Sequence, residues 1–63
     1  MEAGYYPIRI ARAALLVVYR NGRRRTTLSL YSEHGGLVKI HHGSTAMRVA
    51  ELLVCPVERT VRR

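Results

Sequence analysis

The sequence contains no aspartate, no tryptophan and no phenylalanine, and it has a single cysteine among its 63 residues. One cysteine cannot form an internal disulfide, so no covalent cross-link stabilises the fold. That residue, Cys55, precedes Pro56 in an apolar run and is predicted to be a small buried hydrophobic side chain. An unpaired thiol is typical of proteins in reducing compartments.

A long hydrophobic run is also missing. The most apolar stretch, 11–19, contains Arg12 and is far shorter than the ~20 residues that span a bilayer. Met1 and Glu2 do not form the basic start of a signal peptide. These features predict a cytoplasmic protein without a membrane partner.

Side chains suited to catalysis are few. The imidazoles of His34, His41 and His42 are the candidate general bases, and no serine, cysteine or carboxylate stands in a recognisable partner pattern with them. His41 and His42 are adjacent, so in a strand they would point to opposite faces and could not readily bind one ion together. We therefore expect no enzyme, no metal, no cofactor and no small-molecule substrate.

Positive charge, by contrast, is abundant. Eleven Lys and Arg residues face four acids, which gives a formal net charge of +7, and all but one of the cations are arginine. Arginine binds phosphate through a planar fork and stacks on bases, and a basic protein attracts polyanions. The alternative is a solvated basic surface without a specific ligand.

The length permits one domain, 1–63, in which we interpret 1–7 as a leader and 62–63 as a basic tip. A chain this short buries roughly 60% of its unfolded surface, so its core alone is marginal. Because neither a disulfide nor a metal compensates, we expect a homodimer or a larger homo-oligomer.

Asn21-Gly22 separates two strand-like runs and predicts a β-hairpin with a type I′ turn, whose two central residues need positive φ. The expected register places Arg20 opposite Arg23 and continues to Ala13 opposite Leu30. One face of this hairpin is predicted to be core; it carries Ala13, Leu15, Val17, Tyr19, Leu28 and Leu30, with Thr26 and Arg24 towards the turn. The other face is predicted to be basic; it carries Arg12, Arg20, Arg23, Arg25, Thr27, Ser29 and Tyr31, with Ala14, Leu16 and Val18 among them.

A third strand is expected over 37–42, after a three-residue loop of His34-Gly35-Gly36. That register places Ile40 opposite Leu30 on the core face. It places Lys39 opposite Tyr31 and His41 opposite Ser29 on the basic face. A two-residue Gly35-Gly36 loop would reverse the faces, and burial of the apolar side chains favours the first choice.

After residue 43 the apolar residues no longer alternate, as in a strand, but recur at the spacing of a helix. Ala46, Met47, Ala50, Leu53 and Val54 form the apolar stripe of a helix, with Ser44 or Thr45 as the N-cap and Cys55-Pro56 at the end. A strand over 47–55 is the alternative. Residues 57–61 alternate and suggest an additional edge strand. Together with a possible break near Ala11 in a first strand over 8–20, this predicts an α+β fold: a small antiparallel sheet of three strands, with four or five possible, and one C-terminal helix.

A basic sheet face with hydroxyls and an aromatic ring suits single-stranded nucleic acid, and a β-ribbon can also enter a duplex groove. We therefore predict a small DNA- or RNA-binding protein that contacts the phosphate backbone with little sequence readout. The candidate nucleic-acid-binding residues are Arg12, Arg20, Arg23, Arg24, Arg25, Thr27, Ser29, Tyr31, Lys39 and His41. Alternatively, Tyr31 is only a cross-strand partner of Lys39. A second hypothesis is a non-enzymatic interaction module, such as a small viral or regulatory adaptor, that binds an acidic protein.

The runs 20–22 and 30–38 show a limited similarity to the first motif of Sm-like RNA-binding proteins, over less than half of the chain. The aspartate and asparagine of that family and the glycine within its second strand are missing. The predicted helix over 44–54 stands where the family continues in strands. We therefore do not assign the chain to this family.

Overall fold

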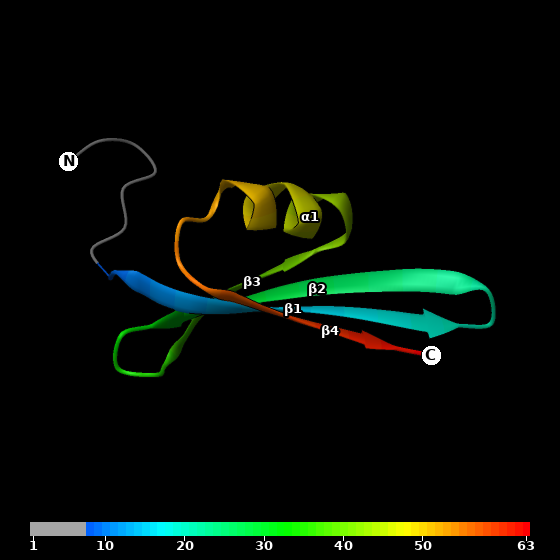
Figure 1. Cartoon of the computed structure of the whole chain (residues 1–63), viewed down its shortest axis with the longest axis horizontal. Helices are drawn as coiled ribbons and strands as arrows, with labels where there is room; N and C mark the ends of the chain where they lie inside the picture. The colour runs from blue at the N-terminus through cyan, green and yellow to red at the C-terminus, as the bar shows by residue number, and fades with distance from the viewer. Residues whose placement is uncertain (1–7) are drawn as a thin grey trace.

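A computed structural model describes residues 8–63, so the predicted leader over 1–7 lies outside the described residues. The elements follow in the order β1 (Ile10–Arg20), β2 (Arg23–Ser32), β3 (Leu37–His42), α1 (Gly43–Leu52) and β4 (Val57–Arg62). The four strands form one sheet in the order β3-β2-β1-β4, and α1 lies over one face of it (Figure 1). The α+β class is therefore confirmed.

One part of the predicted topology is wrong. The sheet is mixed rather than antiparallel, because β4 pairs in parallel with β1. The suggested edge strand over 57–61 is confirmed, because it forms as β4 after the helix and brings the sheet to four strands. Since β3 and β4 run in the same direction at opposite edges of the sheet, their connection has to cross one face, and α1 is part of that crossover.

The β1–β2 hairpin has the predicted turn and register. Asn21 and Gly22 have φ values of 53° and 74°, as a type I′ turn requires. Every predicted pair from Arg20–Arg23 to Ala13–Leu30 is present. β1 begins at Ile10 rather than at residue 8, and a register shift between Ile10 and Arg12 leaves Ala11 unpaired, so the predicted break near Ala11 occurs as a bulge.

The predicted pairing of β2 with β3 is wrong. The Gly35 N–H donates to the Ser32 carbonyl at 2.9 Å, and Gly35 has a φ of +89°, so the three loop residues are 33–35 instead of 34–36. The Ser32 hydroxyl accepts hydrogen bonds from the N–H groups of His34 at 3.3 Å and Gly36 at 3.2 Å. A second register shift then skips Val38.

This shift exchanges the two faces of β3. Lys39 pairs with Leu30, and Ile40 pairs with Ser29. The burial argument failed here because β3 is an edge strand: Ile40 is 40% exposed, so little apolar burial specifies its face.

Helix α1 forms instead of the alternative strand, but its ends differ from the prediction. It begins at Gly43, whose φ of +65° turns the chain sharply out of β3, and neither Ser44 nor Thr45 is the N-cap. His42 occupies the N-cap position without a side-chain hydrogen bond. The helix ends at Leu52, and Val54 is fully exposed.

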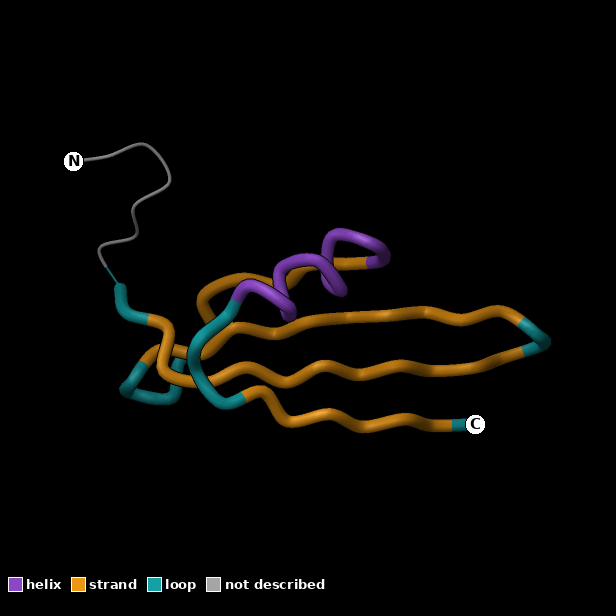
Figure 2. The backbone as a smooth tube through the Cα atoms, turned by 45° about the horizontal axis from the view of Figure 1, so that its top comes forward, coloured by secondary structure: helices purple, strands orange, loops and turns teal. Residues whose placement is uncertain are grey.

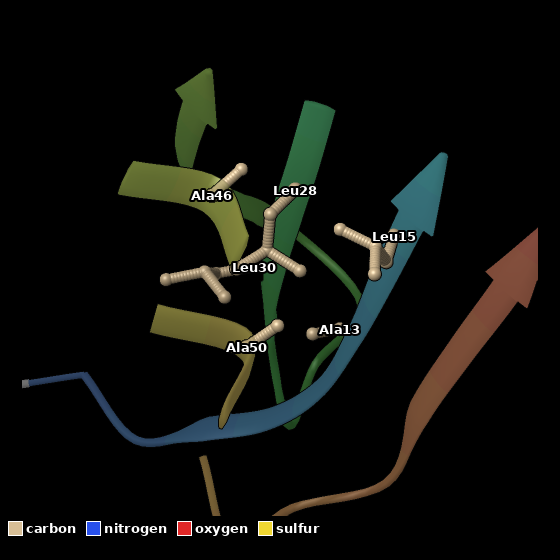
Figure 3. Close-up of a cluster of buried hydrophobic side chains, with 6 residues drawn as sticks. All are labelled: Ala13, Leu15, Leu28, Leu30, Ala46 and Ala50. Atoms are coloured by element: carbon tan, nitrogen blue, oxygen red, sulfur yellow. The ribbon is translucent and has the colours of Figure 1, made fainter. Parts of the chain in front are cut away.

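The core is small and lies between α1 and the central strands (Figure 3). Its buried apolar residues are Ala13, Leu15, Leu28, Leu30, Ala46 and Ala50. The two alanines of α1 let the helix approach the leucines of the sheet closely. Cys55, predicted to be buried, is half-buried and packs against this cluster.

The helix covers only one half of the sheet (Figure 1, Figure 2). The β1–β2 turn and the end of β4 extend beyond it, and the chain measures 43 × 23 × 17 Å. We call the sheet face under α1 the helix face, the opposite one the open face, and the part beyond α1 the hairpin end.

Candidate nucleic-acid interface

The open face is an array of four adjacent strands whose side chains follow from the register. In its central row, Leu16 of β1 lies between Thr27 of β2 and Thr60 of β4, with His42 of β3 beyond Thr27. On one side of it is a row of Ile40, Ser29, Ala14 and Glu58; on the other is a row of Arg25, Val18 and Arg62. Hydroxyls and short apolar side chains therefore occupy the middle of this face.

Arginines gather on the open face at the hairpin end. We call Arg20, Arg23, Arg25 and Arg62 the arginine patch. Arg25 and Arg62 flank Val18 from the two neighbouring strands, about 9.6 Å apart at the backbone. Arg23 precedes Arg25 by two residues in β2, about 6.7 Å away, and pairs with Arg20. A shallow hollow at this end of the sheet is lined by Val18, Arg20, Asn21, Arg23, Arg24 and Arg25.

No acid of the described residues neutralises this patch. Of the three described glutamates, Glu33 lies in the β2–β3 loop, Glu51 lies on α1, and Glu58 lies on the open face four residues before Arg62, about 13 Å away. Like charges directly opposite one another, such as Arg20 and Arg23, destabilise a hairpin. The patch therefore adds nothing to the stability of the sheet, and a bound anion would relieve its repulsion.

At the far end of the open face, Arg12 stacks on Tyr31. The guanidinium carbon of Arg12 lies 4.3 Å from the centre of the Tyr31 ring, within the range of a cation–π interaction. Tyr31 pairs with Leu37 and not with Lys39, so the predicted cross-strand contact with Lys39 is wrong. One face of the ring is occupied by Arg12, which limits the stacking platform that the sequence suggested.

Seven of the predicted binding residues share the open face: Arg12, Arg20, Arg23, Arg25, Thr27, Ser29 and Tyr31. Arg24 pairs with Tyr19 on the helix face, as the alternation predicted. Lys39 and His41, expected on the basic face, pair with Leu30 and Leu28 and are on the helix face. The bulge at Val38 is the reason, because one extra residue turns all following side chains to the other face.

Arg62, predicted only to be part of a basic tip over 62–63, also belongs to the patch. The sequence indicates that Glu58, Thr60 and Arg62 share one face of a strand, but it does not indicate which strand 57–61 pairs with. Parallel pairing with β1 aligns Arg62 with Val18 and so brings it beside Arg25.

No group of three or more histidine, cysteine or acidic side chains among residues 8–63 is arranged to hold a metal ion. The described residues also contain no helix that is long and apolar enough to cross a membrane.

The chain matches no protein-family model, and no curated protein or solved structure is significantly similar to it. Its function therefore has to be inferred from its own side chains and their geometry.

Proposed function

We propose that this protein binds nucleic acid through the arginine patch on the open face, contacting phosphates rather than reading bases. The observation that carries the proposal is the placement of four arginines from three strands on one face, with no acid beside them. Arginine is suited to this task because its guanidinium binds a phosphate bidentately and stays charged at every physiological pH.

The centre of the open face supports the same ligand. Thr27 and Thr60 flank Leu16 and offer hydroxyl donors to phosphate oxygens next to the patch. The Arg12–Tyr31 stack lies farther along β1 and β2 and offers a flat guanidinium surface to a base. Few groups on this face can discriminate between base edges, so the proposed binding has little sequence preference, with DNA and RNA both as candidate ligands. A cytoplasmic setting is part of this proposal, because an unpaired cysteine persists there.

The test is a binding titration with a single-stranded oligonucleotide and with a duplex of equal length, each repeated across a range of salt concentrations. Affinity is expected to fall linearly on a log–log plot, with a slope that counts the phosphate contacts. Tighter binding to the single strand would support stacking on the Arg12–Tyr31 pair, and tighter binding to the duplex would support groove docking of the hairpin end.

The competing function is binding of an acidic protein. Leu16, Val18 and Ile40 on the open face provide apolar contacts that a protein partner would use and a phosphate backbone would not. An acidic polypeptide of equal charge is therefore the matched control ligand. Binding to it that equals or exceeds binding to the oligonucleotide would contradict the proposed function and favour the adaptor.

A further inference from the structure

Strand β4 leaves one edge of the sheet unpaired. It pairs with β1 over six residues without a register shift, and its other side has no neighbour among the described residues. The opposite edge, β3, carries the bulge at Val38 and runs directly into α1, and bulges and covering elements are the usual protection of an edge. β4 has no bulge and no proline between Val57 and Arg62, so it can accept another strand.

The backbone of β4 determines which residues face that edge. The Ala13 N–H donates to the Pro56 carbonyl at 3.0 Å, and Ala13 is aligned with Val57. In a parallel pair, the residues on either side of the aligned one bond to the neighbouring strand. The peptide groups of Glu58, Thr60 and Arg62 are therefore directed at β1. Those of Val57, Arg59 and Val61 are directed at the open edge.

This geometry limits how two β4 strands could pair antiparallel, because an edge-facing residue has to lie opposite another edge-facing residue. Each allowed pairing is named by its central residue, which lies on the two-fold axis opposite its own copy. With Arg59 at the centre, two arginines lie opposite each other, and with Glu58 at the centre, two glutamates do. Centring on Val61 sets Arg59 opposite Arg63. Like charges directly opposite one another are unfavourable.

Centring the pair on Thr60 is the one arrangement of these four without opposed like charges. It sets Glu58 opposite Arg62 of the partner subunit, and the same contact recurs across the two-fold axis. Thr60 lies opposite the partner's Thr60, and Arg59 lies opposite the partner's Val61. Glu58, Thr60 and Arg62 form non-hydrogen-bonded pairs in this register, in which side chains approach most closely.

We propose that two copies of this chain dimerise through β4, antiparallel and centred on Thr60, to form a continuous eight-stranded sheet. The inference goes beyond the proposed function and does not depend on it. Charge complementarity between Glu58 and the partner's Arg62 favours the β4 strand of a second copy as the strand that pairs with this edge. It also accounts for Glu58, the acid on an otherwise basic open face.

Packing of two open faces against each other is the rival arrangement, and charge argues against it. It would bury Leu16, Val18 and Ile40, but it would bring two arginine patches together with only Glu58 on each open face to offset them. Edge pairing instead keeps the two open faces side by side, because its two-fold axis is perpendicular to the sheet. Arg62 then holds the partner's Glu58, while Arg20, Arg23 and Arg25 of both copies stay free for an anion.

A charge swap tests the register. Sedimentation equilibrium is expected to show a species of twice the 7.2 kDa chain mass for the unmodified protein. Glu58→Arg sets two arginine pairs in opposition and is expected to weaken the dimer about tenfold or more. Adding Arg62→Glu to this variant restores opposite charges across the axis and is expected to restore the dimer. Within one chain the two residues are about 13 Å apart, so a rescue of this kind has to be intermolecular.

Three results would overturn the proposal: a monomer at every concentration for the unmodified protein, a dimer unaffected by Glu58→Arg, or a double swap that stays monomeric while its circular dichroism shows a folded chain. Oligonucleotide binding by an unmodified protein that sediments as a monomer would leave the proposed function intact, and a dimer that binds no oligonucleotide would leave the dimer intact, so the two proposals fail separately.

Cross-linking tests the centre of the pair independently of charge. In a Cys55→Ser background, Thr60→Cys places two thiols on α-carbons about 4.5 Å apart, within the range of a disulfide. Mild oxidation is expected to convert this variant to a covalent dimer. Glu58→Cys is the matched control, because in the same register its thiol lies about 13 Å along the strand from the partner's Cys at that position. Equal cross-linking of the two variants would contradict the Thr60-centred register.

Discussion

Removing two arginines from the patch should lower the salt dependence of nucleic-acid binding by a predictable amount. Arg23 and Arg25 are exposed on the same face of β2, two residues apart. Each phosphate contact contributes about 0.7 to the log–log salt slope for a single strand and about 0.9 for a duplex. Loss of two contacts in Arg23→Ala/Arg25→Ala therefore lowers the slope by about 1.4 with a single strand and about 1.8 with a duplex, per protomer.

The stability of this variant should hardly change. Both side chains are exposed, and their removal relieves the repulsion between Arg20 and Arg23, so the free energy of unfolding should stay within about 0.5 kcal/mol of the original value. Urea denaturation checks this, and fluorescence anisotropy with a labelled oligonucleotide at four or more salt concentrations gives the slope.

A matched control variant distinguishes binding at the arginine patch from non-specific attraction between nucleic acid and a basic protein. Lys39→Ala/Arg48→Ala removes the same charge from the helix side of the molecule: Lys39 is exposed and pairs with Leu30 on the helix face, and Arg48 is exposed on α1. Its slope should stay close to that of the unmodified protein. Equal losses in the two double variants would refute the assignment of the interface to the open face.

Three further predictions concern stability and are measured by urea denaturation. Leu28→Ala should lower the free energy of unfolding by about 2–5 kcal/mol, because Leu28 is 0% exposed in a core with few large side chains; a change below 1 kcal/mol would contradict the core as described. Gly43→Ala should cost about 1–2 kcal/mol through its φ of +65° alone, because the added methyl meets no atom within 4 Å beyond the adjacent residues and the backbone of α1; an unchanged stability would mean that the entry into α1 differs. Ser32→Ala should lower the free energy of unfolding by about 1 kcal/mol, because the N–H groups of His34 and Gly36 lose their acceptor. Ser32→Thr keeps the hydroxyl and should retain most of that stability.

The β1–β2 hairpin could be predicted from the sequence because its determinants are local. Asn21-Gly22 requires one turn type, that turn requires one register, and the alternation of Leu15 and Leu28 with polar neighbours selects the buried face. The apolar period of α1 is equally local. These signals located both faces of the β1–β2 hairpin and most of the basic residues on its open one.

The errors share a physical cause, which is weak local specification at the sheet edges. The register of β3 depends on the Ser32 hydroxyl, the position of Gly35 and the bulge at Val38, and little apolar burial opposes the shift that moves Lys39 to the helix face. Each residue of β4 pairs with a residue of β1 that lies 44 positions earlier in the sequence, and no pattern within 57–61 identifies that partner. Arg62 was therefore missed as a member of the patch.

The most direct test of the central claim, that the open-face arginines contact nucleic acid, is an NMR titration of the arginine side-chain Nε–Hε resonances with a single-stranded oligonucleotide. Binding at the arginine patch predicts large shifts for Arg20, Arg23 and Arg25, and a small one for Arg48 on the helix side. Shifts of similar size for all four, or a larger shift for Arg48, would contradict it, as would the absence of any shift at low salt.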